Sequence, residues 1–193
     1  MGRLVYAALT SLDGYAADEE GRFDWAAPDA EVHDAVNKLQ AGVSTMLLGR
    51  RIYDVLVAWE TVPSTVTEPG GTDVSPQERD YSTLWHGCDK VVFSATLAEP
   101  PSARTRIVRD LDPDEVRRLK AESPGDLAIG GPTLAGQALA AGLVDEVHLF
   151  AFPVLVGGGL RALPSGLRAE LRLREARRFD SGVVHSGYDV VLS

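Results

Sequence analysis

The chain has 193 residues, 45% of them hydrophobic and 24% charged, which is the profile of an ordinary globular protein. A formal net charge of −9 argues against a broad nucleic-acid or membrane surface, because phosphates would be repelled over most of the molecule. The single cysteine and four histidines without tight ligand spacing predict no disulfide and no metal site. With no signal-peptide pattern and no membrane-length apolar run, we expect one cytoplasmic domain over 1–193.

Strand-like and helix-like segments alternate along most of the chain. Short apolar runs predict strands at 4–12, 43–48, 90–94, 107–109, 127–129 and 144–156. Helical spacing after a cap, glycine or proline predicts helices at 29–42, at 50–58, from 112 onward and at 132–142. The segment 60–80, rich in Pro, Thr and Gly, is predicted to be a long surface loop. Apolar segments at 171–173 and 183–192 predict closing antiparallel strands, so we expect a mixed sheet with helices on both faces.

The strongest local feature is a glycine pair between a strand and a helix. Gly130 and Gly131 follow the strand and Pro132 begins the helix. Glycines allow a backbone to approach a ligand closely, and the free N–H groups of a helix N-terminus attract anions. A pyrophosphate suits this position, although a tight turn without a ligand explains the spacing equally well.

A second crossing combines a glycine with two arginines. Gly49 ends a predicted strand, and Arg50 and Arg51 open the next helix. Cations are unfavourable at a helix N-terminus, so the pair indicates a bound anion such as a phosphate. The alternative is that both arginines are solvated surface residues.

Acidic residues near the first strand are candidates for substrate binding or proton transfer. Asp13 follows the first strand, where it either relays a proton or forms an Asp-Gly turn. Asp29 lies shortly after Trp25, and we favour it as the N-cap of the helix that follows. Gly157, Gly158 and Gly159 form either a close-approach loop or a flexible turn.

In combination, these segments resemble the family of the C-terminal reductase domain of the riboflavin-biosynthesis deaminase–reductase, within the dihydrofolate-reductase-like superfamily. The resemblance spans nearly the whole chain. It rests on six blocks in order: 11–17 with Asp24 and Trp25, 48–53, 91–94, 129–134, 142–149 and 153–159. It implies a three-layer α/β/α fold with a central mixed, mostly parallel sheet and an antiparallel C-terminal edge.

The resemblance also implies an activity and a set of site residues. The activity is NADPH-dependent reduction of a small heterocycle or imine, as in 5-amino-6-(5-phosphoribosylamino)uracil reductase. Gly49, Arg50, Arg51 and Ser94 would hold the 2′-phosphate side of NADPH, and Ala8 would offer backbone contacts to the nicotinamide. The pyrophosphate would bind at Gly130, Gly131, Pro132, Thr133 and Leu134. Substrate would lie beside Asp13, Trp25 and Asp29, with Asp13 as a candidate proton source, and a homodimer is expected.

Three departures from the family patterns leave alternatives open. With one cysteine, the chain cannot form the zinc deaminase site of the bifunctional enzyme. Dihydrofolate reductase carries a pocket acid after its tryptophan, but the sequence around Asp29 differs. Basic residues for a substrate phosphate are limited to Arg3 and the arginines of the cofactor site. Dihydrofolate reductase proper and a non-catalytic nucleotide-binding module are therefore the alternatives.

Overall fold

A computed structural model describes residues 1–65 and 74–191. Eight strands form one sheet in the order β5-β4-β3-β6-β1-β7-β10-β9, and β2 pairs with β8 in a small second sheet. Pairing is parallel from β5 to β7, and β10 and β9 add the antiparallel edge. The strands are β1 Leu4–Ser11, β2 Tyr15–Ala17, β3 Val43–Gly49, β4 Asp89–Phe93, β5 Thr105–Val108, β6 Asp126–Gly130, β7 Glu146–Phe152, β8 Leu160–Arg161, β9 Glu170–Arg178 and β10 Val184–Val191.

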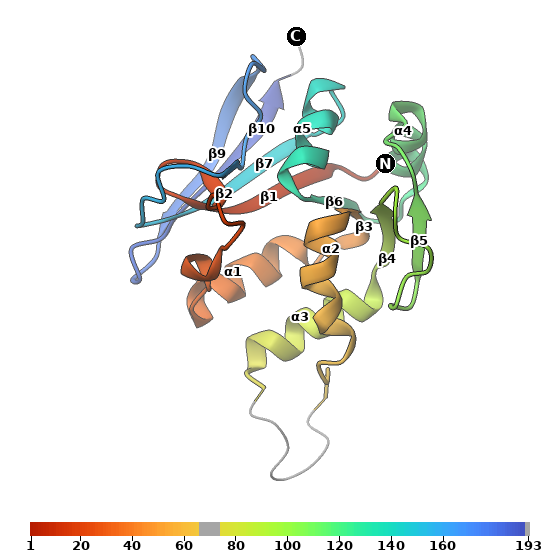
Figure 1. Ribbon diagram of the computed structural model, residues 1–193, viewed down its shortest axis with the longest axis horizontal. Coiled ribbons are helices and arrows are strands. Elements are labelled where there is room, and N and C mark those ends of the chain that lie inside the picture. Colours follow the sequence, from red (N-terminus) through yellow and green to blue (C-terminus); the bar gives the residue numbers. More distant parts are fainter. Residues whose placement is uncertain (66–73, 192–193) are drawn as a thin grey trace.

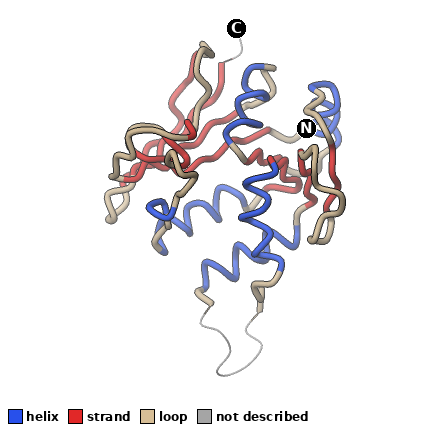
Figure 2. The backbone as a smooth tube through the Cα atoms, viewed as in Figure 1, coloured by secondary structure: helices blue, strands red, loops and turns tan. Residues whose placement is uncertain are grey.

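Helices cover both faces of this sheet (Figures 1 and 2). They are α1 Ala30–Gln40, α2 Arg50–Leu56, α3 Pro76–Gly87, α4 Pro113–Glu122 and α5 Pro132–Ala140, with 3-10 turns η1 Asp24–Ala26 and η2 Val57–Glu60. Helices α4 and α5 contribute to one core cluster with the sheet, while α1, α2 and α3 contribute to two clusters on the other face. The predicted three-layer α/β/α fold with its antiparallel C-terminal edge is confirmed.

The side chain of the preceding residue caps the first turn of α1 and of α4. The Asp29 carboxylate accepts a hydrogen bond from the Val32 amide at 2.8 Å, which confirms its predicted capping role. Asp112 accepts from the Asp114 amide at 2.9 Å at the start of α4. Capping thus fixes where each helix begins.

Helix α3 corrects the prediction of a continuous loop over 60–80. It begins at Pro76, and its N-cap Ser75 forms a reciprocal capping box with Glu78. The Ser-x-x-Glu pattern, with proline at the first helical position, is present in the sequence. The Pro- and Gly-rich residues that precede this pattern led to the prediction of a loop. Closure of the predicted 60–80 loop over a site would involve residues 66–73, which lie outside the described residues.

The short pair β2–β8 was also missed from the sequence. Its strands have three and two residues, too few to show an alternating pattern. Pairing of Tyr15 with Arg161 brings the segment after β1 against the glycine-rich segment after β7.

Among the described residues, no helix is long and apolar enough to cross a membrane.

Candidate active site

The glycines that the sequence singled out lie together at the carboxyl ends of β3 and β6. Leu48 is in register with Gly130, and a Cβ built on Gly49 would lie 3.6 Å from the Gly130 carbonyl oxygen. A Cβ built on Gly131 would lie 3.7 Å from the Gly49 Cα. The two crossings therefore form one continuous backbone surface, which we call the glycine edge (Gly49, Gly130 and Gly131).

Backbone geometry at Gly131 requires glycine. Its φ is +94°, a region that L-residues other than glycine rarely adopt. Gly131 is the N-cap of α5, and no side chain caps this helix. The amides of Thr133 and Leu134 therefore have neither an intrahelical acceptor nor a side-chain cap, and they are donors suited to a pyrophosphate. The Leu134 side chain is buried in the core, so only its backbone is available.

Three arginines lie around this edge, and they differ in what they already bind. Arg50 forms an ion pair with Asp54 one turn along α2, at 2.7 Å, so its guanidinium is shared with a carboxylate. Arg51, next to it, is exposed. Arg109, which was not predicted as a site residue, follows β5 and donates to the Ser94 carbonyl at 2.7 Å. Its position directly after a strand was the available signal.

Ser94 extends the row of strand ends by one strand. It follows β4, whose last residue Phe93 is in register with Gly49. The Ser94 hydroxyl accepts hydrogen bonds from the amides of Thr96 and Leu97, at 3.3 and 3.0 Å. Ser94 therefore shapes the turn after β4. Because it follows the residue in register with Gly49, it lies beside the glycine edge.

Strand β1 is left partly uncovered next to the glycine edge. Its pairing with β6 ends at Tyr6 and Ile129, whereas its pairing with β7 continues to Ser11. Residues 7–9 are accordingly only partly buried, although β1 is a central strand. A flat ligand lying beyond Ile129 would meet unpaired backbone groups of β1.

Ala7, not Ala8, presents its backbone to that open side. In a parallel ladder, alternate residues direct their N–H and C=O groups to opposite neighbours. The Arg3 carbonyl accepts from β6, and the Leu4 carbonyl accepts from the residue that precedes β7. Ala8 therefore bonds toward β7, where its register partner is Leu149. The nicotinamide contact that the resemblance implies at Ala8 stays a prediction, and the strand geometry offers the Ala7 backbone as the alternative.

Asp13 connects the end of β1 to the glycine-rich loop after β7. Its carboxylate accepts hydrogen bonds from the amides of Gly157 at 2.8 Å and Val156 at 3.3 Å. A hydrogen bond from Ser11, helped by these amides, lowers the pKa of Asp13 below its ordinary value. Asp13 is therefore ionised at neutral pH, which favours a positioning role over the proton-donating role expected from the sequence.

A cavity of about 370 Å³ lies between the start of α1, the end of β7 and the turn between β9 and β10. It is lined by Trp25, Ala27, Asp29, Phe152, Pro153, Val154, Ser181 and Val183. The structure thus brings together the two residues expected to bind substrate, Trp25 and Asp29. The buried Trp25 Nε1 has no hydrogen-bond partner among the described residues.

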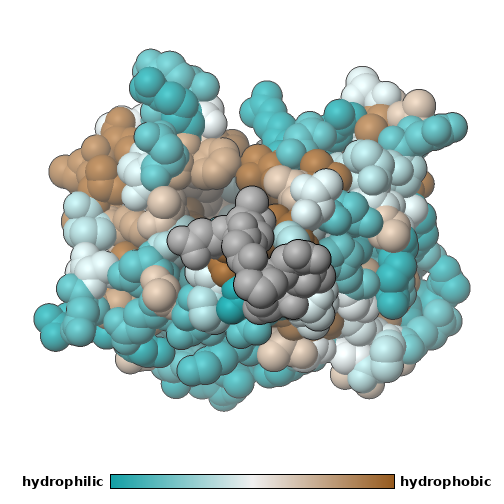
Figure 3. Space-filling model, turned by 90° about the horizontal axis from the view of Figure 1, so that it is seen from below, coloured by the Kyte–Doolittle hydropathy of each residue, from teal (hydrophilic) through white to brown (hydrophobic). Residues whose placement is uncertain are grey.

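Apolar side chains are also exposed on the surface of the molecule near β2 (Figures 1 and 3). Viewed from below, one group of apolar side chains lies on the side where Figure 1 labels β2 (Figure 3). Leu12, Phe23 and Leu155 are among the large apolar residues that are exposed.

Arg3 lies at the amino end of β1 and pairs with Asp126 and Glu146. It is therefore not available for a substrate phosphate at the carboxyl ends of the strands.

The fold and the glycine edge define a dihydrofolate-reductase-like α/β domain. The family model of the RibD C-terminal domain matches residues 3–185, and the chain belongs to this family. The chain is 29% identical over 190 residues to the uncharacterized protein YyaP of Bacillus subtilis, covering 96% of this chain and 94% of YyaP. It is 27% identical to the riboflavin biosynthesis protein RibD of Mycobacterium tuberculosis, covering 98% of this chain but only 53% of RibD, about half its length.

Solved structures show the same fold. A putative riboflavin biosynthesis protein from Shewanella sp. PV-4 superposes with a TM-score of 0.74 and 21% identity, covering 98% of this chain and 99% of that one. The deaminase/5-amino-6-(5-phosphoribosylamino)uracil reductase of Thermotoga maritima gives a TM-score of 0.65 and 16% identity, covering 98% of this chain and 57% of that one. At these identities the likeness establishes the fold alone.

Proposed function

We propose that this protein is an NADPH-dependent reductase of a small heterocyclic or imine substrate. The observation that carries the proposal is the glycine edge: three glycines from two adjacent strand ends lie together at the start of α5, which no side chain caps. Membership of the RibD C-terminal domain family supports the same conclusion. NADPH supplies the hydride, and the chain's own residues bind it and orient the substrate.

The residues present fit such a cofactor. The Thr133 and Leu134 amides would hold the pyrophosphate, and Arg51 would meet the 2′-phosphate, with Arg50 joining after release from Asp54. The uncovered edge of β1 at Ala7 would orient the nicotinamide carboxamide.

The substrate side of the proposal involves the cavity at Trp25 and Asp29. A ring of heterocycle size would pack on the Trp25 side chain, which lines this cavity. Asp29 holds α1 in place and contributes negative charge, since hydrogen bonds from the Val32 amide and Ser181 lower its pKa. A ribosylaminopyrimidine, as in the reaction named for the Thermotoga maritima relative, has the donors to meet this carboxylate.

Titration of the purified protein with NADPH, followed by nicotinamide fluorescence, tests the proposal directly. We expect saturable binding to one site per chain, stronger for NADPH than for NADH. Absence of binding at millimolar NADPH would end the proposal. Binding without turnover of any aminopyrimidine or dihydropterin substrate would instead support the nucleotide-binding module.

Replacing Arg51 by Ala should weaken NADPH binding about tenfold and leave NADH binding unchanged. The reason is that a charge-assisted hydrogen bond contributes about 1.5–3 kcal/mol, and only NADPH carries the 2′-phosphate. Dissociation constants of both cofactors give the measurement. Arg117→Ala, an exposed arginine on α4 paired with Asp114, is the matched control. Equal losses for the two cofactors would remove Arg51 from the 2′-phosphate site.

Replacing Asp13 by Asn should raise KM while kcat falls less than about tenfold. The amide retains one acceptor for the Gly157 amide but places a donor near the Val156 amide, so the loop after β7 shifts. Because the pKa of Asp13 is lowered, its charge is lost only below its ordinary titration range, and the wild-type rate should not depend on it near neutral pH. A loss of kcat exceeding a thousandfold, with KM unchanged, would restore Asp13 as the proton source.

The assembly expected from the resemblance is a homodimer, and we retain it as a proposal. Every residue of the edge strand β9 is exposed in the single chain. Sedimentation of the purified protein should give a mass of twice 20.7 kDa. A monomer at micromolar concentration would contradict this proposal without bearing on cofactor binding.

A further inference from the structure

Away from the cofactor and substrate residues, β7, β9 and β10 bring two histidines and a glutamate together. The potential ligand atoms of His148, Glu175 and His185 all lie within 4.8 Å of one another. His148 Nδ1 is 3.0 Å from His185 Nε2 and 3.7 Å from a Glu175 carboxylate oxygen. Both histidines are buried, at 2% and 6% exposure, while the Glu175 side chain is 57% exposed.

These separations suit a tetrahedral metal ion. Zinc–nitrogen bonds of about 2.0–2.1 Å at tetrahedral angles place neighbouring ligand atoms about 3.4 Å apart. The two measured separations from His148 Nδ1, 3.0 and 3.7 Å, lie on either side of that value. Imidazole nitrogen and carboxylate oxygen are both ordinary zinc ligands, and three protein ligands leave a fourth position for water.

The sheet register explains why distant residues meet here. His148 on β7 and Glu175 on β9 are both in register with Gly187 on the strand between them, and His185 precedes Gly187 by two residues on the same face. A Cβ on Gly187 would lie 2.8 Å from His148 Nδ1 and 3.1 Å from Glu175 Cγ. Glycine at this position therefore leaves the space into which the ligand atoms converge.

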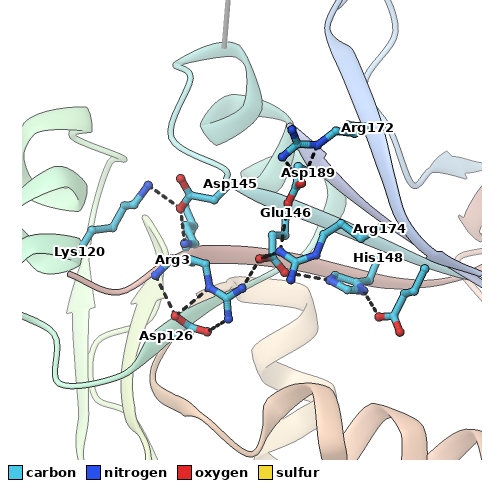
Figure 4. A network of polar contacts seen from close by, with 11 residues as sticks. Arg3, Lys120, Asp126, Asp145, Glu146, His148, Arg172, Arg174 and Asp189 are labelled. Carbon is cyan, nitrogen blue, oxygen red and sulfur yellow. Dashed lines mark hydrogen bonds and ion pairs between the residues drawn. The ribbon is translucent and has the colours of Figure 1, made fainter. Parts of the chain in front are cut away.

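A carboxylate beside His148 favours the tautomer that a metal needs. Glu146 lies 3.2 Å from His148 Nε2, and Arg3 and Arg174 pair with the Glu146 carboxylate (Figure 4). A proton on Nε2 that is donated to Glu146 leaves the Nδ1 lone pair directed away from it, toward the cluster. Carboxylate–histidine pairs of this kind orient the histidines of metal sites.

The His185 ring is likewise held in place by packing. It is buried and stacks on Phe150 with centroids 4.2 Å apart and planes at 9°. A hydrogen-bonded pair, with His185 donating to His148, is the competing account; it uses the same histidines and has no need of Glu175.

We propose that His148 Nδ1, His185 Nε2 and the Glu175 carboxylate bind one Zn²⁺ or similar divalent transition-metal ion. The ion would tie the exposed edge strand β9 to β10 and β7. This differs from the expectation of no metal site, which relied on spacing along the chain. The inference does not depend on the reductase activity.

Tag-free, EDTA-treated full-length protein should be titrated with Zn²⁺ by calorimetry and with Co²⁺ by visible absorption. We expect one ion per chain and the intense visible bands of tetrahedral Co²⁺. Glu175→Gln should weaken binding by at least about tenfold, and His185→Gln should abolish it. Glu170→Gln, also on β9 but outside the cluster, and His33→Gln, a distant histidine, should bind as the wild type does.

Two results would overturn the proposal. One is no stoichiometric binding of either ion at millimolar concentration, which leaves the hydrogen-bonded histidine pair as the explanation. The other is binding that Glu175→Gln and His185→Gln leave unchanged, which would mark an adventitious ion only. Circular dichroism checks the fold of each variant, and the exposure of Glu175 keeps that variant informative even if His185→Gln fails to fold.

Discussion

Gly131→Ala should raise the dissociation constant for NADPH by about a hundredfold. At a φ of +94°, an alanine costs about 1–3 kcal/mol of backbone strain, so the turn before α5 must change shape. Its Cβ would also lie 3.4 Å from Ile52 Cγ2 and 3.7 Å from the Gly49 Cα, between the two strand ends. Losing two charge-assisted hydrogen bonds from the first turn of α5 is sufficient for an effect of this size. Fluorescence titration of NADPH measures it.

The matched control is Gly166→Ala. Gly166 also has a positive φ, +78°, but nothing lies within 4 Å of a Cβ built there, and it lies outside the glycine edge. The two variants carry similar backbone strain, so only Gly131→Ala should affect cofactor binding. Wild-type NADPH affinity in Gly131→Ala would show that the cofactor does not approach this backbone, and the proposed function would lose its carrying observation.

Leu127→Ala should lower the free energy of unfolding by about 2–5 kcal/mol. Leu127 is fully buried on β6, the strand that ends in Gly130, and it belongs to the core between the sheet and helices α4 and α5. Removing its side chain loses the transfer free energy and leaves a cavity in a close-packed cluster. Urea denaturation followed by circular dichroism gives the measurement.

Leu155→Ala serves as the control for this substitution. The Leu155 side chain is 70% exposed, so its truncation should change stability by no more than about 0.5 kcal/mol. If the two variants unfolded at the same urea concentration, the packing of β6 against α5 would not support the glycine edge as described.

Local residue patterns predicted some features of the proposed cofactor site and not others. Glycines 49, 130 and 131 were predicted as close-approach positions, because a strand, a glycine and a helix start are readable locally. The pairing of β3 with β6, which places them side by side, was not predicted and is shown by the register. Arg50 was predicted to meet a phosphate, but its pairing with Asp54 depends on side-chain directions along α2.

The sequence by itself determined the alternation of strands and helices, the caps at Asp29 and Asp112, and the family. These depend on local periodicity and capping, which act over a few residues. Tertiary structure alone decided that Ala7 faces the open edge, that Asp13 holds the loop after β7, and that His148 meets His185. Each depends on which strands become neighbours and in what register, and no spacing along a single chain encodes that.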